Sequence, residues 1–179
     1  MSKTAAQVRP SADALHVLLV DDHVLVSETI SAALRETGDF APKTVRSVED
    51  GIAAIKEHGR FDVVLLDYDL PDSQGLSGLR RVIEANGSGV ALFSGVAGRL
   101  VATEAIDQGA AGFVPKTLPL KVLVQALKFI SVGEIYLPFS LLSTGELREE
   151  GAPSLRSREE KVLTLLSEGL SNKEIARVT

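Results

Sequence analysis

FDVVLLDYDLP, residues 61–71, is the stretch of the sequence that predicts the fold. Its apolar run from Val63 to Leu66 is unbroken and contains two β-branched residues, which is typical of a strand buried on both faces of a parallel sheet. The run ends at Asp67, so a carboxylate follows at the carboxyl end of the strand, where open α/β sheets bind their ligands. Pro71 and the polar residues after it indicate a loop. We therefore expect a carboxylate at the rim of a rigid sheet.

Similar apolar runs recur along the chain, and helical patterns separate them. The predicted strands are residues 16–20, 43–45, 63–66, 90–93 and 112–114. The apolar faces of the predicted helices fall within residues 26–34, 52–55, 76–83, 100–106 and 120–127. Strands and helices that alternate five times predict right-handed βαβ units and a doubly wound, five-stranded parallel sheet of the α/β class.

Three local features refine this arrangement. Residues 47–50, SVED, have the pattern of a capping box at the start of the second helix. Leu100 belongs, with Val101, Ala105 and Ile106, to the apolar pattern that predicts the fourth helix. Pro115 adjoins the last strand, so that strand is expected at an edge of the sheet, where a missing N–H is tolerated.

Composition limits the classes of function. The chain has 179 residues, of which 45% are hydrophobic and 24% charged, and this length suits one domain with a smaller second one. No apolar run approaches the roughly 18 residues of a membrane span, and the first residues do not resemble a signal peptide, so a cytoplasmic protein is expected. The absence of cysteine excludes disulfides, thiolate metal sites and cysteine nucleophiles. A net charge of -5 disfavours a uniformly basic nucleic-acid binder but is compatible with a local binding patch.

Charged and polar side chains follow the ends of four predicted strands: Asp21 and Asp22, then Asp67, Ser94 and Lys116. The carboxyl ends of parallel strands meet at one edge of a sheet, so we expect these groups to converge. Crowded carboxylates repel one another unless a cation neutralises them, and Mg2+ suits oxygen ligands. A metal, an ammonium and a hydroxyl around one carboxylate are what phosphoryl transfer to that carboxylate requires.

These motifs resemble the receiver domains of two-component response regulators. The matching segments, in chain order, are residues 20–23 (VDDH), residues 66–71 (LDYDLP), Ser94 and residues 109–116 (GAAGFVPK). The Asp-Asp-His form resembles the NarL/LuxR subfamily, as do the segments LRSREEKVL at 155–163 and GLSNKEIA at 169–176. The resemblance covers about residues 15–178.

The resemblance implies a flavodoxin-like receiver fold and a set of residue roles. Asp67 is expected to accept a phosphoryl group from a histidine kinase or a phosphotransfer protein. Asp21 and Asp22 are expected to hold Mg2+ together with Asp67 and the backbone carbonyl of Asp69, and Asp22 is the more direct ligand. Lys116 is expected to pair with the phosphoryl oxygens. The implied protein is a phosphoacceptor that assists its own phosphorylation and dephosphorylation, and not an enzyme in the usual sense.

The resemblance also implies a conformational switch. Ser94 is expected to turn toward the bound phosphate and Phe113 to follow it inward, which moves the surface formed by the fourth helix, the last strand and the fifth helix. The expected readout is transcription regulation. A homodimer through the helices that flank the sheet is also expected.

The sequence predicts four segments: a flexible leader at 1–13, a receiver domain at 14–133, a linker at 134–154 and a partial helix-turn-helix at 155–179. The last forms a small α-helical C-terminal segment whose two helices begin with capping boxes. In the subfamily that it resembles, a further helix enters the major groove of DNA. That recognition helix has no counterpart here. We therefore expect DNA binding by the full-length protein and no specific DNA binding by this chain.

Other interpretations stay open. Residues 67–69 form a DxD after a strand, with a serine and a lysine downstream, as in phosphatases of the haloacid dehalogenase type, although in those the acidic pair comes late in the chain. A second alternative is an interaction module that works without phosphorylation. Asp21 or Asp22 alone would more simply cap the first helix. His23 is expected to be a surface residue.

Overall fold

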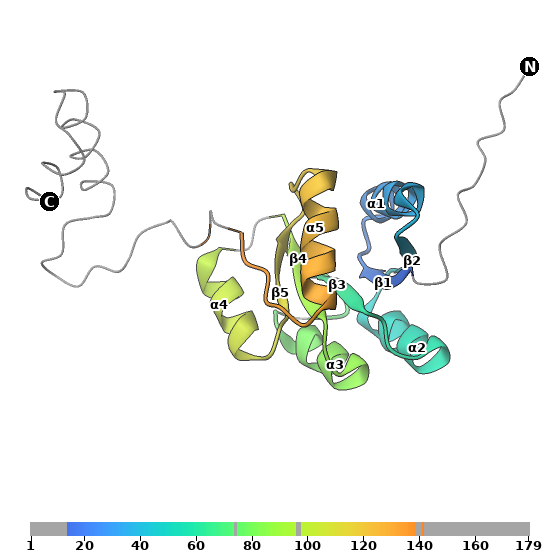
Figure 1. Ribbon diagram of the computed structural model, residues 1–179. Coiled ribbons are helices and arrows are strands. Elements are labelled where there is room, and N and C mark those ends of the chain that lie inside the picture. The colour runs from blue at the N-terminus through green and yellow to red at the C-terminus, as the bar shows by residue number, and fades with distance from the viewer. Residues whose placement is uncertain (1–13, 74, 96–97, 139–140, 142–179) are drawn as a thin grey trace, which may run out of the picture. The chain divides into compact units, whose positions relative to one another are not determined.

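The computed structural model describes residues 14–73, 75–95, 98–138 and 141, which form a parallel sheet with helices on both sides (Figure 1). The strands are β1 (Leu15–Val20), β2 (Phe40–Val45), β3 (Val63–Asp67), β4 (Val90–Ser94) and β5 (Gly112–Pro115). The helices are α1 (Val24–Thr37), α2 (Val48–His58), α3 (Ser77–Asn86), α4 (Arg99–Asp107) and α5 (Leu120–Ser131). The strand order is β2-β1-β3-β4-β5, and every pair is parallel. The predicted doubly wound sheet is confirmed.

The sheet separates two hydrophobic cores. In β3, Val64 and Leu66 pack into the core beneath α2, α3 and α4, while Val63 and Leu65 pack into the core beneath α1 and α5. Figure 1 shows the same division, with α1 and α5 on one side of the strands and α2 and α3 on the other. Successive side chains of a strand point to opposite faces, so an unbroken apolar run is the pattern that such a doubly covered sheet requires.

The ends of the helices follow the local signals in the sequence. The side chain of Ser47 accepts a hydrogen bond of 3.0 Å from the N–H of Asp50, so the predicted cap at the start of α2 is confirmed. Gly38 ends α1 in the left-handed conformation, with φ of 77°, which glycine adopts without steric cost.

Two expectations at the edges of the sheet had different outcomes. Pro115 lies in β5, which is an edge strand as predicted. The second strand is longer than predicted, because it begins at Phe40 and includes Pro42. Since β2 is the other edge strand, the missing N–H of Pro42 leaves no neighbouring strand without a donor.

The predicted fourth helix is present, but Leu100, which is part of its apolar pattern, does not face the core. Its side chain is 86% exposed, and α4 packs against the core through Ala102 and Ala105. Leu100 is about half a turn away from these alanines around the helix axis. The short helix contains apolar residues all round, so its sequence alone did not identify the buried side.

The segment after α5 pairs with the free edge of β5. The N–H of Phe113 donates to the carbonyl of Tyr136 at 2.9 Å, and the N–H of Tyr136 donates to the carbonyl of Ala111 at 3.0 Å. A Cβ at residue 112 would lie 2.5 Å from the oxygen of Tyr136, so this close approach depends on Gly112. Residues 134–138, which the sequence assigns to the linker, therefore begin as an attachment to the sheet.

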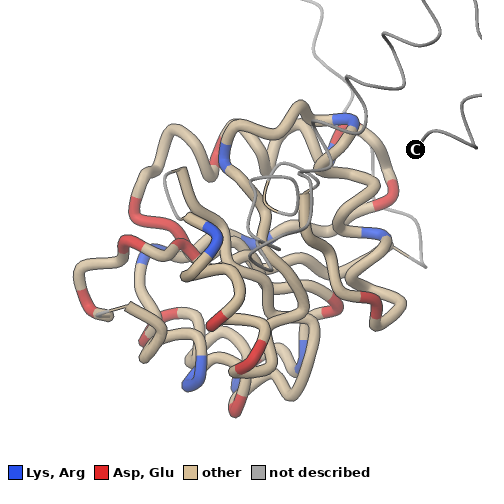
Figure 2. Tube along the Cα trace, turned by 90° about the vertical axis from the view of Figure 1, so that its left-hand side faces the viewer, with Lys and Arg blue, Asp and Glu red and all other residues tan. Residues whose placement is uncertain are grey.

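The predicted leader at 1–13, most of the linker and the partial helix-turn-helix at 155–179 lie outside the described residues. Within the described ranges, none of the helices has the length and apolarity that crossing a bilayer requires. Acidic and basic residues are interspersed along the trace on the face that Figure 2 presents.

A buried amide provides a test of how α3 is attached to the sheet. Asn86 is fully buried, and its side chain bonds both the N–H and the carbonyl of Phe61 at 2.9 Å. We predict that Asn86→Ala lowers the free energy of unfolding by about 2–3 kcal/mol, because two backbone groups lose their partners. Urea denaturation followed by circular dichroism measures the change. The control Gln125→Ala, which removes an exposed amide from α5, should change stability by less than about 0.5 kcal/mol. Equal losses in the two variants would contradict the prediction.

Candidate functional site

The register of the sheet brings two acids side by side. Val20 of β1 pairs with Leu66 of β3, so Asp21 and Asp67 leave their strands at the same level. Both are buried, with 1% and 3% of their surface exposed. Neighbouring parallel strands lie about 4.8 Å apart, so the two carboxylates are close enough to need a shared counter-charge.

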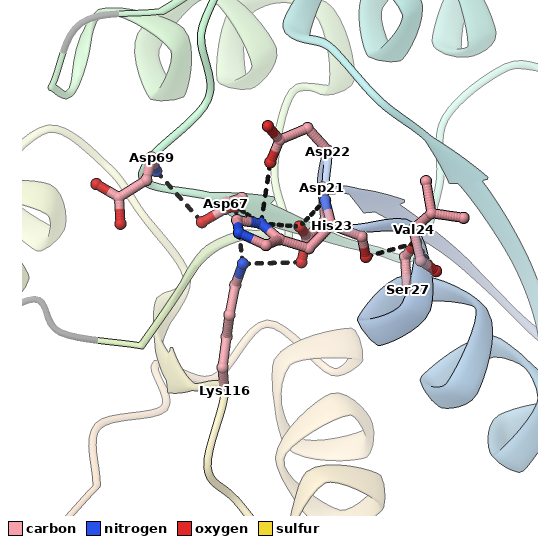
Figure 3. Close-up of polar contacts among 8 residues, drawn as sticks. All are labelled: Asp21, Asp22, His23, Val24, Ser27, Asp67, Asp69 and Lys116. Atoms are coloured by element: carbon pink, nitrogen blue, oxygen red, sulfur yellow. Dashed lines mark hydrogen bonds and ion pairs between the residues drawn. The ribbon is translucent and has the colours of Figure 1, made fainter.

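Lys116, which follows the edge strand β5, provides that counter-charge. Ser94 of β4 pairs with Pro115 of β5, and the N–H of Lys116 then donates to the carbonyl of Ser94 at 2.9 Å. The Nζ atom of Lys116 lies 2.7 Å from Asp67 Oδ2 and 2.9 Å from Asp21 Oδ2 (Figure 3). The structure therefore brings the predicted lysine and these two acids into one pocket.

Asp22 and Asp69 stand at the mouth of this pocket. The side chain of Asp22 is 38% exposed, and one of its oxygens belongs to a group of ligand atoms that all lie within 4.8 Å of one another. The N–H of Asp69 donates to Asp67 Oδ1 at 3.2 Å, while its own carboxylate points away from the cluster (Figure 3). The backbone of Asp69 thus faces Asp67, which agrees with a role for its main chain and not its side chain.

His23 is a member of the cluster that the sequence reading missed. Its ring is 60% exposed, but Nδ1 lies 3.1 Å from Asp21 Oδ1, 3.0 Å from Asp22 Oδ1 and 3.5 Å from Asp67 Oδ2. The expectation of a surface residue is correct, but it did not include the contacts with the three acids. The available signal was its position directly after two acids at a strand end. The contact with Asp67 also requires the turn between β1 and α1, which no periodicity reveals.

The capping interpretation of the acidic pair finds no support in the geometry. The N-cap of α1 is His23, and no side chain caps this helix. Asp21 Oδ1 instead accepts a hydrogen bond of 2.8 Å from the N–H of His23. Both oxygens of Asp21 are thus directed at the pocket.

Ser94 and Phe113 are buried in the two strands β4 and β5 that precede Lys116. Ser94 is buried at the end of β4, one residue beyond the pair formed by Asp67 and Phe93. Phe113 is buried in β5, in the same core cluster as Ala102 and Ala105 of α4. The structure connects both residues to the strand that leads to Lys116.

The charges of the pocket suit a divalent cation. Three carboxylates face one ammonium, so two negative charges are uncompensated when the imidazole is neutral. Two like charges about 4 Å apart repel by about 4 kcal/mol at an effective dielectric constant of about 20. The donor set is mainly carboxylate oxygen at the end of a sheet, which fits Mg2+.

The pKa of Lys116 reflects the same crowding. Burial on its own lowers this pKa, because it disfavours the ammonium, but the hydrogen bond to Asp67 and the ion pair with Asp21 outweigh it and raise the pKa above its ordinary 10.5. Since the folded pKa is the higher one, the stabilisation from these contacts is fully present below pH 10.5 and is lost as the pH rises through the folded value.

We predict that Lys116 loses its proton above pH 10.5 and that Asp67→Asn lowers the pH of this titration, because one of its two anionic partners becomes neutral. NMR of the lysine ε-carbon over an alkaline pH series measures both values. The control Asp107→Asn, an exposed position at the end of α4, should leave the titration of Lys116 unchanged. The same titration in wild type and Asp67→Asn would disprove the assigned cause.

Comparison with known proteins identifies the family. Residues 17–128 match the response regulator receiver domain. A glycerol metabolism activator from Pseudomonas putida is 31% identical over 176 residues, which cover 89% of this chain and 79% of that protein. The nitrate/nitrite response regulator protein NarL of Escherichia coli is 28% identical over 170 residues, which cover 90% and 79% of the two chains.

The fold comparison agrees. A crystal structure of a LuxR family DNA-binding response regulator from Silicibacter pomeroyi matches with a TM-score of 0.62 and 32% identity, over 70% of this chain and 98% of that one. The receiver match spans more than half of the sequence, and the pocket, the strand order and the relatives agree with it. The chain belongs to the response regulator receiver family and is of the NarL/LuxR type.

Proposed function

We propose that Asp67 accepts a phosphoryl group from a histidine kinase or a phosphotransfer protein, and that its phosphorylation regulates an output domain. The observation that carries the proposal is the setting of Asp67, a buried carboxylate with Lys116 Nζ 2.7 Å from one of its oxygens. An acceptor whose product carries extra negative charge requires a fixed cation beside it, and Lys116 is that cation.

In the proposed reaction, an oxygen of the Asp67 carboxylate attacks phosphorus and forms a P–O bond, while the bond from phosphorus to the donor nitrogen breaks. The leaving imidazole retains the electron pair and takes a proton from solvent. The N–H of Asp69, which donates to Asp67 Oδ1, holds the orientation of the carboxylate. Lys116 then pairs with the phosphoryl oxygens in place of the carboxylate oxygen.

Asp22, Asp67 and the backbone carbonyl of Asp69 would hold Mg2+. When bound, the ion supplies positive charge against the carboxylates and the incoming phosphoryl group. Asp21 would contribute mainly through its charge, because its two oxygens already contact Lys116 and His23. Because the oxygens of Asp21 are already in contact with these groups, Asp22 is the more direct ligand in this proposal.

The proposed switch involves Ser94 and Phe113. The hydroxyl of Ser94 turns toward the phosphate, and Phe113 adjusts within the core that it shares with α4. Two observations support this coupling: the hydrogen bond from Lys116 N–H to the carbonyl of Ser94, and the burial of Phe113 against the elements of the moving surface. The surface that responds is formed by α4, β5 and α5, which is also available for a homodimer.

The proposed output is control of transcription in the cytoplasm. The relative from Silicibacter pomeroyi is described as a DNA-binding response regulator, which supports DNA as a partner of the full-length protein. The segment predicted to form the output domain, 155–179, lies outside the described residues. Membership of the receiver family supports a regulator over the phosphatase alternative.

We predict that acetyl phosphate and Mg2+ add one phosphoryl group to the wild type and none to Asp67→Asn, because the amide is not a competent nucleophile. Intact-protein mass spectrometry measures the addition. Asp107→Asn, which changes an exposed acid in the same way, should be phosphorylated like the wild type. A wild type that takes up no phosphate would favour the interaction module that works without phosphorylation.

We predict that Mg2+ at about one hundred times its dissociation constant raises the free energy of unfolding by about 2.7 kcal/mol. Asp22→Asn should lose most of this gain, because the variant removes a charged ligand from the mouth of the pocket. Urea denaturation with and without Mg2+ gives the difference for each protein. The control Asp107→Asn should gain as much stability from Mg2+ as the wild type. An equal gain in Asp22→Asn would contradict the prediction.

A further inference from the structure

The imidazole of His23 lies beside the three acids, but it has no role in the proposed phosphorylation. Its Nδ1 lies 3.0, 3.1 and 3.5 Å from oxygens of Asp22, Asp21 and Asp67. An octahedral ion with bonds of about 2.1 Å keeps neighbouring ligand atoms about 3 Å apart. The contact of Nδ1 with Asp21 Oδ1 is a hydrogen-bond distance in this structure. The 3.0 Å between Nδ1 and Asp22 Oδ1 is also the spacing of two neighbouring ligands around one small ion.

Hydrogen bonds of its backbone fix the position of His23. The N–H of His23 donates to Asp21 Oδ1 at 2.8 Å, and its carbonyl accepts from the N–H groups of Val26 and Ser27 at 3.0 and 3.1 Å. The residue is thus anchored at the beginning of α1 by main-chain bonds that do not involve the ring. The ring itself is 60% exposed, so its rotation would not displace the core.

The ring adds a kind of donor that the carboxylates lack. A neutral imidazole with its proton on Nε2 presents a lone pair at Nδ1, whereas the ammonium of Lys116 has none. Carboxylate, carbonyl and water ligands suit Mg2+ and Mn2+, while imidazole suits zinc, copper, iron and nickel ions. Among the described residues that face this pocket, His23 is the nitrogen ligand.

We propose that His23 is a direct ligand of the divalent ion in this pocket and that it shifts the preference of the site from Mg2+ toward ions that imidazole suits, such as Ni2+. The proposal rests on the metal-dependent function proposed above and deepens it. It makes Asp22 and His23 a ligand pair of mixed oxygen and nitrogen, and it gives this receiver a metal selectivity that an oxygen-only pocket lacks.

Pulsed electron paramagnetic resonance of Mn2+ bound to the untagged full chain tests the ligand directly. The wild type should show the modulation of a directly bound nitrogen, and selective 15N labelling of histidine should convert it to the 15N pattern. His23→Gln should lose this signal. His58→Gln, which removes an exposed histidine of α2, should retain it. Thermal unfolding of both variants establishes that they are folded.

Metal titration by calorimetry tests the selectivity. We expect His23→Gln to raise the dissociation constant of Ni2+ about tenfold and that of Mg2+ less than about twofold, because only the nitrogen donor is lost. His58→Gln should change neither constant. Equal changes for the two ions in His23→Gln would overturn the proposed selectivity.

The outcomes separate this inference from the proposed function. Mn2+ that binds to the wild type without a histidine nitrogen signal overturns the role of His23 and leaves phosphorylation of Asp67 intact. A wild type that binds neither Mn2+ nor Mg2+ overturns both the inference and the metal-dependent function. A histidine nitrogen signal that persists in His23→Gln also overturns the assignment.

Discussion

The ammonium of Lys116 lies between two buried carboxylates, and the arrangement of the pocket depends on this contact. Asp21 and Asp67 come from β1 and β3, while Lys116 follows β5. Since β4 lies between β3 and β5, the lysine side chain reaches past a strand to join ends that are not neighbours. Buried charges without partners cost several kcal/mol each, so loss of any one of the three residues would leave an uncompensated charge and destabilise the fold.

The sheet holds these charges close because its interior leaves little freedom. Each strand supplies apolar side chains to two separate cores, and a slip of one residue would exchange the sets. The register that pairs Val20 with Leu66 is therefore strongly specified, and the level at which Asp21 and Asp67 leave the sheet is specified with it. The carboxylate of Asp22 and the ring nitrogen of His23 complete the cluster. Both residues lie in the turn after β1, where the backbone of His23 is hydrogen-bonded to residues nearby in the sequence.

The sequence allowed prediction of what depends on pattern along the chain. The apolar run before Asp67 and the cap at Ser47 were predictable, because each follows from local chemistry with a fixed period or spacing. Leu100 was not, because a nine-residue helix with apolar residues on several sides does not identify its buried face. The contacts of His23 were missed for a different reason: Asp21 and Asp22 adjoin it in the sequence, but only the folded chain brings its ring to Asp67.

The pairing of Tyr136 with β5 has a mechanical consequence. The hydrogen bonds that attach it join main-chain atoms at Ala111 and Phe113, so they depend on the position of the strand and not on the chemistry of the attached side chains. The same strand continues through Pro115 to Lys116. Tyr136 is thus attached to the strand that leads to Lys116, so a displacement of that strand would move Tyr136 with it.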